Sequence, residues 1–76
     1  MNITVKLTGL LAGAAGFREK VLESSDGITA WDLFSRLALP VGKQWTRVSI
    51  NKRLAAGNQI LCDGDEVFFF PIGGGG

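Results

Sequence analysis

The sequence DGDEVFFFPIGGGG occupies residues 63–76 and decides the fold of the chain. It opens with Asp, Gly and Asp at 63–65, which are typical residues of a tight turn. The next five residues, 66–70, have the strong β propensity of a strand, and Pro71 is expected to end it. Four glycines follow. A strand that runs directly into such a tail indicates a folded domain with an accessible C-terminal end.

Successive side chains of this strand point to opposite faces of the sheet. Val67 and Phe69 therefore share one face, whereas Phe68 and Phe70 share the other. One helix can cover only one face, so one of the two pairs is expected to be exposed or half-exposed beside the tail. Such an apolar patch usually marks a protein interface. In the alternative arrangement, a long loop covers Phe68 and Phe70.

The tail, Gly73–Gly76, has no side chains and is expected to be flexible, because glycine loses more conformational freedom on ordering than any other residue. Fully extended, four residues reach about 13 Å beyond Ile72, far enough to carry a carboxylate from a protein surface to the floor of an active site. The terminal carboxylate of Gly76 is the one reactive group of this tail, and a partner must activate it. The alternative interpretation is a frayed terminus or an added linker.

A helix is predicted in the middle of the chain, from Thr29 to about Leu39. Thr29 is a good N-cap, and Asp32 three residues later makes a variant of the capping box. Pro40 is expected to stop the helix. The apolar face that would pack on the sheet recurs at helical spacing and contains Ala30, Leu33, Phe34, Leu37 and Ala38.

The other strands are predicted from alternation and β propensity, at Asn2–Thr8, Phe17–Glu23 (at a sheet edge), Arg47–Asn51 and, as a short edge strand, Ile60–Cys62. Residues 9–16, GLLAGAAG, contain three glycines and are predicted to be a loop. Residues 51–58 are predicted to be a turn followed by irregular structure. The order of elements predicts an α+β domain over residues 1–71, with one helix on one face of a mixed four- to five-stranded sheet, and a tail at 72–76.

Composition argues against several classes of function. The 76 residues are 46% apolar, which suffices for one small core, and eight basic residues oppose seven acidic ones. A nucleic-acid-binding protein would show a basic excess, and the small cluster of Arg47, Lys52 and Arg53 is interpreted as a solvated edge. With no histidine and one cysteine, the chain has no set of ligands for a metal cluster, no internal disulfide and no imidazole to activate its four serines. Cys62 is predicted to be a small buried residue at a strand end.

The sparing use of cysteine is typical of a cytoplasmic protein. Lys6 and the LTGLLAGAAG segment that follows loosely resemble a signal peptide. The alternation of Ile3, Val5 and Leu7 with polar residues favours a strand of the domain instead. No stretch is long enough for a transmembrane helix, so a membrane is not an expected partner. The balanced charge likewise argues against a nucleic acid as a partner.

The residues of the C-terminal stretch resemble the signature of the MoaD/ThiS family of ubiquitin-like sulfur carriers: a DGDEV turn, a hydrophobic strand and a terminal Gly-Gly. Phe69, Phe70 and Pro71 are more similar to the MoaD branch, the small subunit of molybdopterin synthase, than to the thiamine branch. Two features depart from the family pattern: Ile72 stands where a second proline is common, and two further glycines extend the usual pair. The resemblance implies a β-grasp fold.

The resemblance also implies that the protein is a carrier rather than an enzyme. An E1-like adenylating enzyme would use ATP to adenylate the carboxylate of Gly76, and a persulfide sulfur donor would convert it to a thiocarboxylate. The large subunit of molybdopterin synthase (MoaE type), or another sulfur acceptor enzyme, would then receive the sulfur for the molybdenum cofactor. The carrier itself would bind no cofactor. By this resemblance, the partners dock on Phe68, Phe70 and Pro71, and their active sites receive Gly73, Gly74 and Gly75.

Three alternatives remain open from the sequence. The sulfur could serve a thiazole, a tungsten cofactor or an amino-acid precursor. An activated Gly76 could instead be joined to a lysine of a target, which would make the chain a protein modifier. The chain could also be a plain interaction domain with an inert tail.

Overall fold

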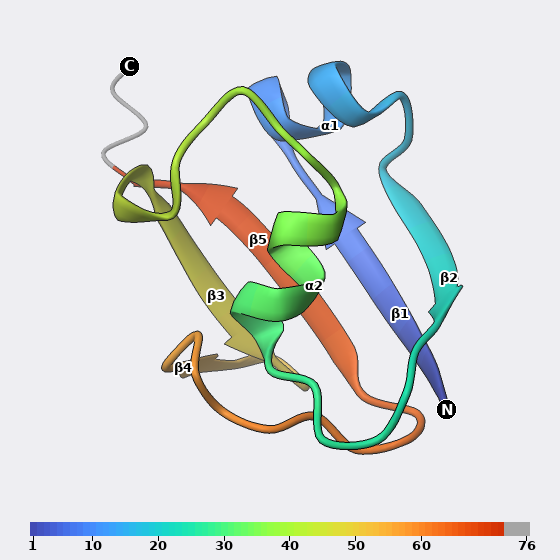
Figure 1. The fold of residues 1–76 in the computed structure, drawn as a ribbon. Coiled ribbons are helices and arrows are strands. Elements are labelled where there is room, and N and C mark those ends of the chain that lie inside the picture. Colours follow the sequence, from blue (N-terminus) through green and yellow to red (C-terminus); the bar gives the residue numbers. More distant parts are fainter. Residues whose placement is uncertain (73–76) are drawn as a thin grey trace.

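The computed structural model describes residues 1–72, and Gly73–Gly76 lie outside the described residues. A five-stranded sheet carries a helix across one face (Figure 1). In chain order the elements are β1 (Asn2–Leu7), α1 (Gly9–Ala15), β2 (Glu19–Glu23), α2 (Ala30–Arg36), the 3₁₀ turn η1 (Lys43–Trp45), β3 (Thr46–Ile50), β4 (Arg53–Ala55) and β5 (Glu66–Pro71). The strands are ordered β2-β1-β5-β3-β4. The central pair β1 and β5 is parallel, and the other neighbours are antiparallel. This is the β-grasp arrangement, and it confirms the predicted fold class.

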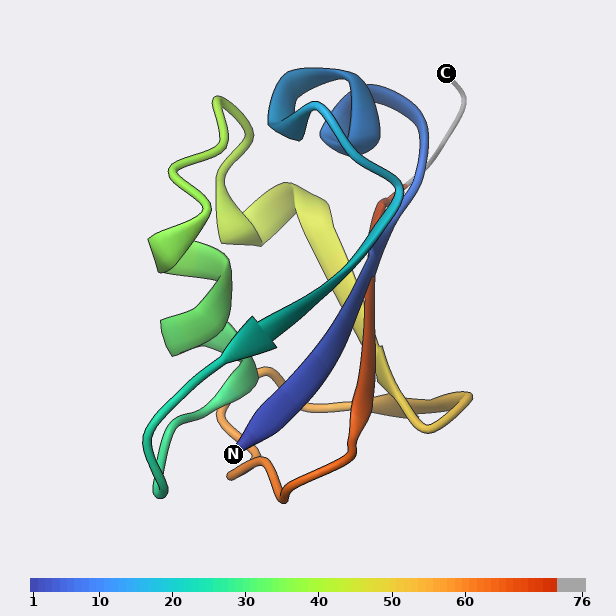
Figure 2. The ribbon, with the colours of Figure 1, turned by 90° about the vertical axis from the view of Figure 1, so that its right-hand side faces the viewer.

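The core lies between the sheet and α2, which Figure 2 shows on one side of the edge-on sheet. Val67 and Phe69 of β5 are fully buried on this side. The ring of Phe69 packs against two aromatic rings of α2, with centroids 5.1 Å from Phe34 and 6.5 Å from Trp31. Leu33, the fully buried leucine of α2, completes the contact. The strand that leads to the tail is therefore held at the centre of the core.

The predicted capping box of α2 is confirmed. The backbone N–H of Asp32 donates to Oγ1 of Thr29 at 3.1 Å, and the N–H of Thr29 donates to Oδ2 of Asp32 at 2.9 Å. Two hydrogen bonds with Thr29 lower the pKa of Asp32 below its ordinary value of 3.8. The bond with the Thr29 backbone has the larger effect, and the bond with its side chain has the smaller one. The predicted end at about Leu39 is too late, because α2 ends at Arg36 and Ala38 adopts a left-handed φ of 49°.

The prediction of a loop at residues 9–16 is wrong. Residues Gly9–Ala15 form the short helix α1, which Gly16 ends in the left-handed conformation with φ 84°. Leu11 and Ala12 are buried, so tertiary packing holds a segment whose glycines give it a poor helix propensity.

The stretch 51–58, predicted to be irregular, contains the edge strand β4. A two-residue turn joins β3 to β4, and both of its residues have positive φ: 52° at Asn51 and 69° at Lys52. Such a turn matches the twist of a hairpin. Asparagine tolerates this conformation, but lysine is not a typical turn residue, which explains why the hairpin was missed.

The prediction of a strand at Ile60–Cys62 is also wrong, because Ile60 makes only an isolated bridge with Thr29. Leu61 is the buried anchor of this segment, and its N–H donates to the carbonyl of Ile28 at 2.9 Å. Cys62 was predicted to be buried but is exposed. Its N–H donates to the carboxylate of Asp65 at 2.8 Å, so the residue belongs to the turn before β5 and its side chain lies outside the core.

Candidate functional site

The end of β5 fixes the point at which the tail leaves the domain. Pro71 lies opposite Thr46 of β3 in the antiparallel register. One residue later, the N–H of Ile72 donates to the carbonyl of Trp45 at 2.8 Å. We call the end of the sheet at which β5 finishes and β3 begins the tail end. Because β5 is the central strand and is paired along its length, the tail starts from a firmly held base at the tail end.

The face of the sheet opposite α2 carries the two remaining phenylalanines of β5. Phe68 and Phe70 are half-buried, and their ring centroids are 5.4 Å apart. Phe68 lies between Lys6 of β1 and Ser49 of β3, and Phe70 lies opposite Arg47 of β3. Figure 2 shows α2 on the other side of the sheet. We call this surface the open face.

The open face extends over the outer strands as well. Leu54 of β4 pairs with Ser49 and is therefore in the same row as Phe68, with 69% of its surface exposed. Val21 of β2 pairs with Thr4, whose side chain points to the open face, and it is 60% exposed. Four large apolar side chains thus lie on one uncovered face. A face of this kind is typical of a protein-interaction surface.

The structure distinguishes the two pairs of side chains on β5. The pair that faces the core is Val67 and Phe69, so the pair beside the tail is Phe68 and Phe70. Neither ring is fully buried by any part of residues 1–72. Pro71 is half-buried at the end of the same strand. The predicted positions in the tail, Gly73, Gly74, Gly75 and Gly76, lie outside the described residues.

Sequence reasoning missed three exposed apolar residues around this site: Leu54, Val21 and Trp45. Leu54 was missed because β4 was not predicted. Trp45 lies in η1, and its backbone binds Ile72, yet its side chain is 62% exposed. A tryptophan in a polar loop just before a strand was the available signal for this position.

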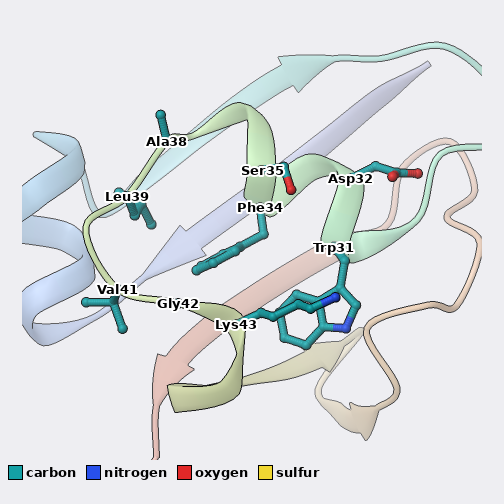
Figure 3. Close-up of a pocket in the computed structure, with 9 residues that line it drawn as sticks. All are labelled: Trp31, Asp32, Phe34, Ser35, Ala38, Leu39, Val41, Gly42 and Lys43. Atoms are coloured by element: carbon teal, nitrogen blue, oxygen red, sulfur yellow. The ribbon is translucent and has the colours of Figure 1, made fainter.

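A hollow of about 440 Å³ lies on the helix side of the molecule, between α2 and the segment that leads to η1 (Figure 3). Trp31, Phe34 and Leu39 line it, and its charged residues are Asp32 and Lys43. The carboxylate of Asp32 already caps α2. The hollow lies on the opposite side of the sheet from Phe68 and Phe70.

Within residues 1–72, no group of three or more potential metal ligands comes together. No helix in this part of the chain is long and apolar enough to cross a membrane.

Several solved structures are similar to this chain. SAMP1 from Haloferax volcanii has a TM-score of 0.80 with 27% identity, and the match covers 100% of both chains. A complex of subunits 1 and 2 of the molybdopterin-converting factor from Helicobacter pylori gives a TM-score of 0.63 with 22% identity over 100% of both chains. Urm1 from Sulfolobus solfataricus gives 0.61 with 25% identity, covering 91% of this chain and 99% of the other. Comparison with curated protein sequences gives no match.

These structures share the β-grasp fold, in which the last strand is central and leads into the C-terminus. The sequence model of the ThiS family matches residues 5–76, which include the open-face residues of β5 and the whole glycine tail. The chain is a member of the ThiS family of ubiquitin-like proteins.

Proposed function

We propose that the chain is a sulfur carrier whose working group is the C-terminal carboxylate of Gly76. The observation that carries the proposal is the continuity of one strand: β5 is fixed in the core, exposes Phe68 and Phe70 on the open face, and leads directly to the glycine tail. The match to the ThiS family extends to residue 76 and supports a role for the tail. In this proposal the chain is a co-substrate of its partners rather than an enzyme.

The first step is activation by an E1-like adenylating enzyme. An oxygen of the Gly76 carboxylate attacks the α-phosphorus of ATP and expels pyrophosphate, which leaves an acyl-adenylate. The carboxylate is a poor electrophile, whereas the adenylate has AMP as a good leaving group. No residue of this chain has to act as acid or base in the step.

The second step is sulfur transfer. The terminal sulfur of a partner's persulfide attacks the carbonyl carbon of Gly76 and expels AMP, which gives an acyl disulfide. A second thiol of the partner then attacks the partner's cysteine sulfur in this acyl disulfide and breaks the S–S bond. A disulfide forms within the partner, and the carrier leaves as a thiocarboxylate. Two electrons pass from the thiol to the acyl sulfur. A glycine at this position leaves the carbonyl carbon open to attack, because it has no side chain.

The open face provides the docking surface in this proposal. Phe68, Phe70 and Pro71 lie at the base of the tail, so a partner that covers them also receives the tail. Aromatic residues, phenylalanine among them, are enriched in protein interfaces. Gly73, Gly74 and Gly75 would then pass through a channel too narrow for side chains.

We propose that the acceptor is the large subunit of molybdopterin synthase. The Helicobacter pylori structure that resembles this chain contains subunit 1 of a molybdopterin-converting factor bound to subunit 2. A larger partner of that kind fits an open face with four exposed or half-buried apolar residues. The sulfur would then build the dithiolene of molybdopterin, in the cytoplasm.

A second candidate function is protein modification. One similar structure from Haloferax volcanii is described as a small archaeal modifier protein, with 26% identity and a TM-score of 0.77. The same adenylate of Gly76 would then be attacked by a lysine of a target, with loss of AMP and formation of an isopeptide bond.

One experiment separates the two functions. The chain is produced in its own host with an N-terminal affinity tag and recovered both with and without a thiol-specific reagent. A carrier gives a thiocarboxylate on the free chain and no conjugates of high molecular mass. A ladder of conjugates that disappears when Gly75 and Gly76 are deleted would establish the modifier instead. An unmodified chain without conjugates would contradict both functions.

A further inference from the structure

The charged residues of this chain are separated along the sheet, although the net charge is only +1. β1 and β5 are parallel, so their first residues mark the far end of the sheet and their last residues mark the tail end. Of the seven carboxylates, only Glu19 lies toward the tail end, where it pairs with Lys6. The other six lie at the far end, in turns, near the start of α2 or β5, or at the end of β2: Glu23, Asp26, Asp32, Asp63, Asp65 and Glu66. Three cations lie at the same end, namely Arg36, Lys52 and Arg53. With six carboxylates against three cations, the far end has a net negative charge.

The tail end carries three exposed cations, Arg18, Lys43 and Arg47, which we call the basic collar. The carbonyl of Arg18 accepts a hydrogen bond from the last residue of β1, Lys43 begins η1, and Arg47 is the second residue of β3. Within residues 1–72 the only ion pairs are those of Lys6, at 3.6 Å from Glu19 and 3.4 Å from Glu66. The collar therefore has no carboxylate partner within the described part of the chain.

Arg47 has a special position in the collar, because it lies directly opposite Phe70 on the open face. Side chains opposite each other in an antiparallel pair have Cβ atoms about 4.5–5.5 Å apart. A partner that covers Phe70 therefore also contacts the side chain of Arg47. Removing an unpaired charge from water is costly unless the new surroundings provide an opposite charge. A carboxylate suits this site, since it can accept two parallel hydrogen bonds from a guanidinium.

Resting on the proposed function, in which a partner receives the tail, we propose that the basic collar docks on an acidic rim of Asp and Glu side chains around the mouth of the channel in the E1-like adenylating enzyme. Arg47 pairs with a carboxylate beside the pocket for Phe70, and Arg18 and Lys43 face other carboxylates of the rim. The acidic far end points away from this rim. The charge separation thus orients the carrier during the encounter, so that the tail end arrives first.

The test compares two identical charge reversals at opposite ends of the sheet. Arg47→Glu removes the central cation of the collar. Arg53→Glu makes the same change in net charge on an exposed residue of β4, at the far end. Both variants should keep the wild-type melting temperature, because neither arginine side chain has a hydrogen bond or ion pair within residues 1–72. Association with the E1-like enzyme of the same organism is measured by biolayer interferometry over a series of salt concentrations.

We expect Arg47→Glu to lower the association rate constant about tenfold relative to Arg53→Glu at about 20 mM salt, and the difference to shrink to less than about twofold at 0.5 M, because salt screens such contacts. Equal rates for the two variants at low salt would overturn the proposal. The proposed function is tested separately by ATP–pyrophosphate exchange. If wild type and Arg47→Glu support exchange with the same KM for the carrier, the carrier function stands and the role of the basic collar is contradicted. The absence of exchange with the wild-type chain would remove both.

Discussion

The two faces of β5 carry similar apolar residues but differ in how deeply these residues are buried. Phe68, Phe69 and Phe70 are three identical side chains in a row, yet Phe69 is fully buried against α2 and its neighbours are half-buried on the open face. Backbone alternation assigns the same residue type to two different roles. One face holds the strand in the core, and the other presents apolar surface beside the tail. The contrast teaches that, in a domain this small, a single strand can supply both the stability and the docking surface.

The largest effect on stability is expected for a change on the face of β5 that α2 covers. Phe69→Ala removes a ring that packs against Trp31 and Phe34, and it should lower the free energy of unfolding by about 3–5 kcal/mol. Phe68→Ala, the matched change one residue away, should cost much less because its side chain is only half-buried. Urea unfolding followed by circular dichroism measures both. Equal losses would show that the two faces contribute alike to the core.

The helix that covers the core face offers a second pair. Leu33→Ala empties a fully buried site, and we expect a loss of about 2–5 kcal/mol in the free energy of unfolding. Leu37→Ala should cost less, because Leu37 is the half-buried C-cap of α2. Thermal melts of the two variants give the comparison. If Leu37→Ala were the more damaging change, the segment after α2 would hold the core and the helix itself would not.

The open face should respond in the opposite way. Phe70→Glu should leave the melting temperature almost unchanged and weaken binding to the E1-like enzyme by about 2 kcal/mol or more, the cost typical of an aromatic residue at the centre of an interface. Isothermal titration calorimetry measures the affinity. If Phe70→Glu unfolded the chain instead of weakening binding, Phe70 would belong to the core and the assignment of the open face would be wrong.

The smallest effect concerns the cap that starts the covering helix. Thr29→Ala removes the side-chain acceptor for the Asp32 N–H and should cost about 1 kcal/mol of stability.

Since the pKa of Asp32 is lowered in the folded state, the contribution of its carboxylate to stability is present above pH 3.8 and is lost as the pH falls through the folded pKa. The stability difference between wild type and Asp32→Asn should therefore be largest near neutral pH and vanish in acid. A difference that persists at pH 2 would rule out the carboxylate as its source.

The sequence predicts the elements that are encoded locally. Alternating apolar residues identified β1, β3 and β5, and the spacing of Thr29 and Asp32 identified the start of α2. The helix α1 was not predictable in this way, because its glycines argue against a helix and the burial of Leu11 and Ala12 in the tertiary structure holds it in place. The same applies to Cys62, which the turn before β5 directs outward.

The candidate site was predicted in part for the same reason. Alternation separated Phe68 and Phe70 from Val67 and Phe69, but only the packing of α2 decides which pair is covered. The extension of the open face over Leu54 depends on the pairing of β3 with β4, and the basic collar depends on bringing Arg18 next to the end of β1. Long-range register of this kind is not visible in a single sequence.

The central claim is that the chemistry of this protein resides on Gly76, and intact mass spectrometry tests it most directly. The chain is incubated with the E1-like enzyme of the same organism, ATP and a persulfide donor with a reducing thiol. We expect one terminal oxygen to be replaced by sulfur in the wild-type chain. Cys62→Ala should give the same change, whereas deletion of Gly76 should reduce it strongly. The shortened chain would end about 3.8 Å short of a reactive centre that its carboxylate must approach to about 3–3.5 Å. An unmodified terminus, or sulfur attached to Cys62, would contradict the account.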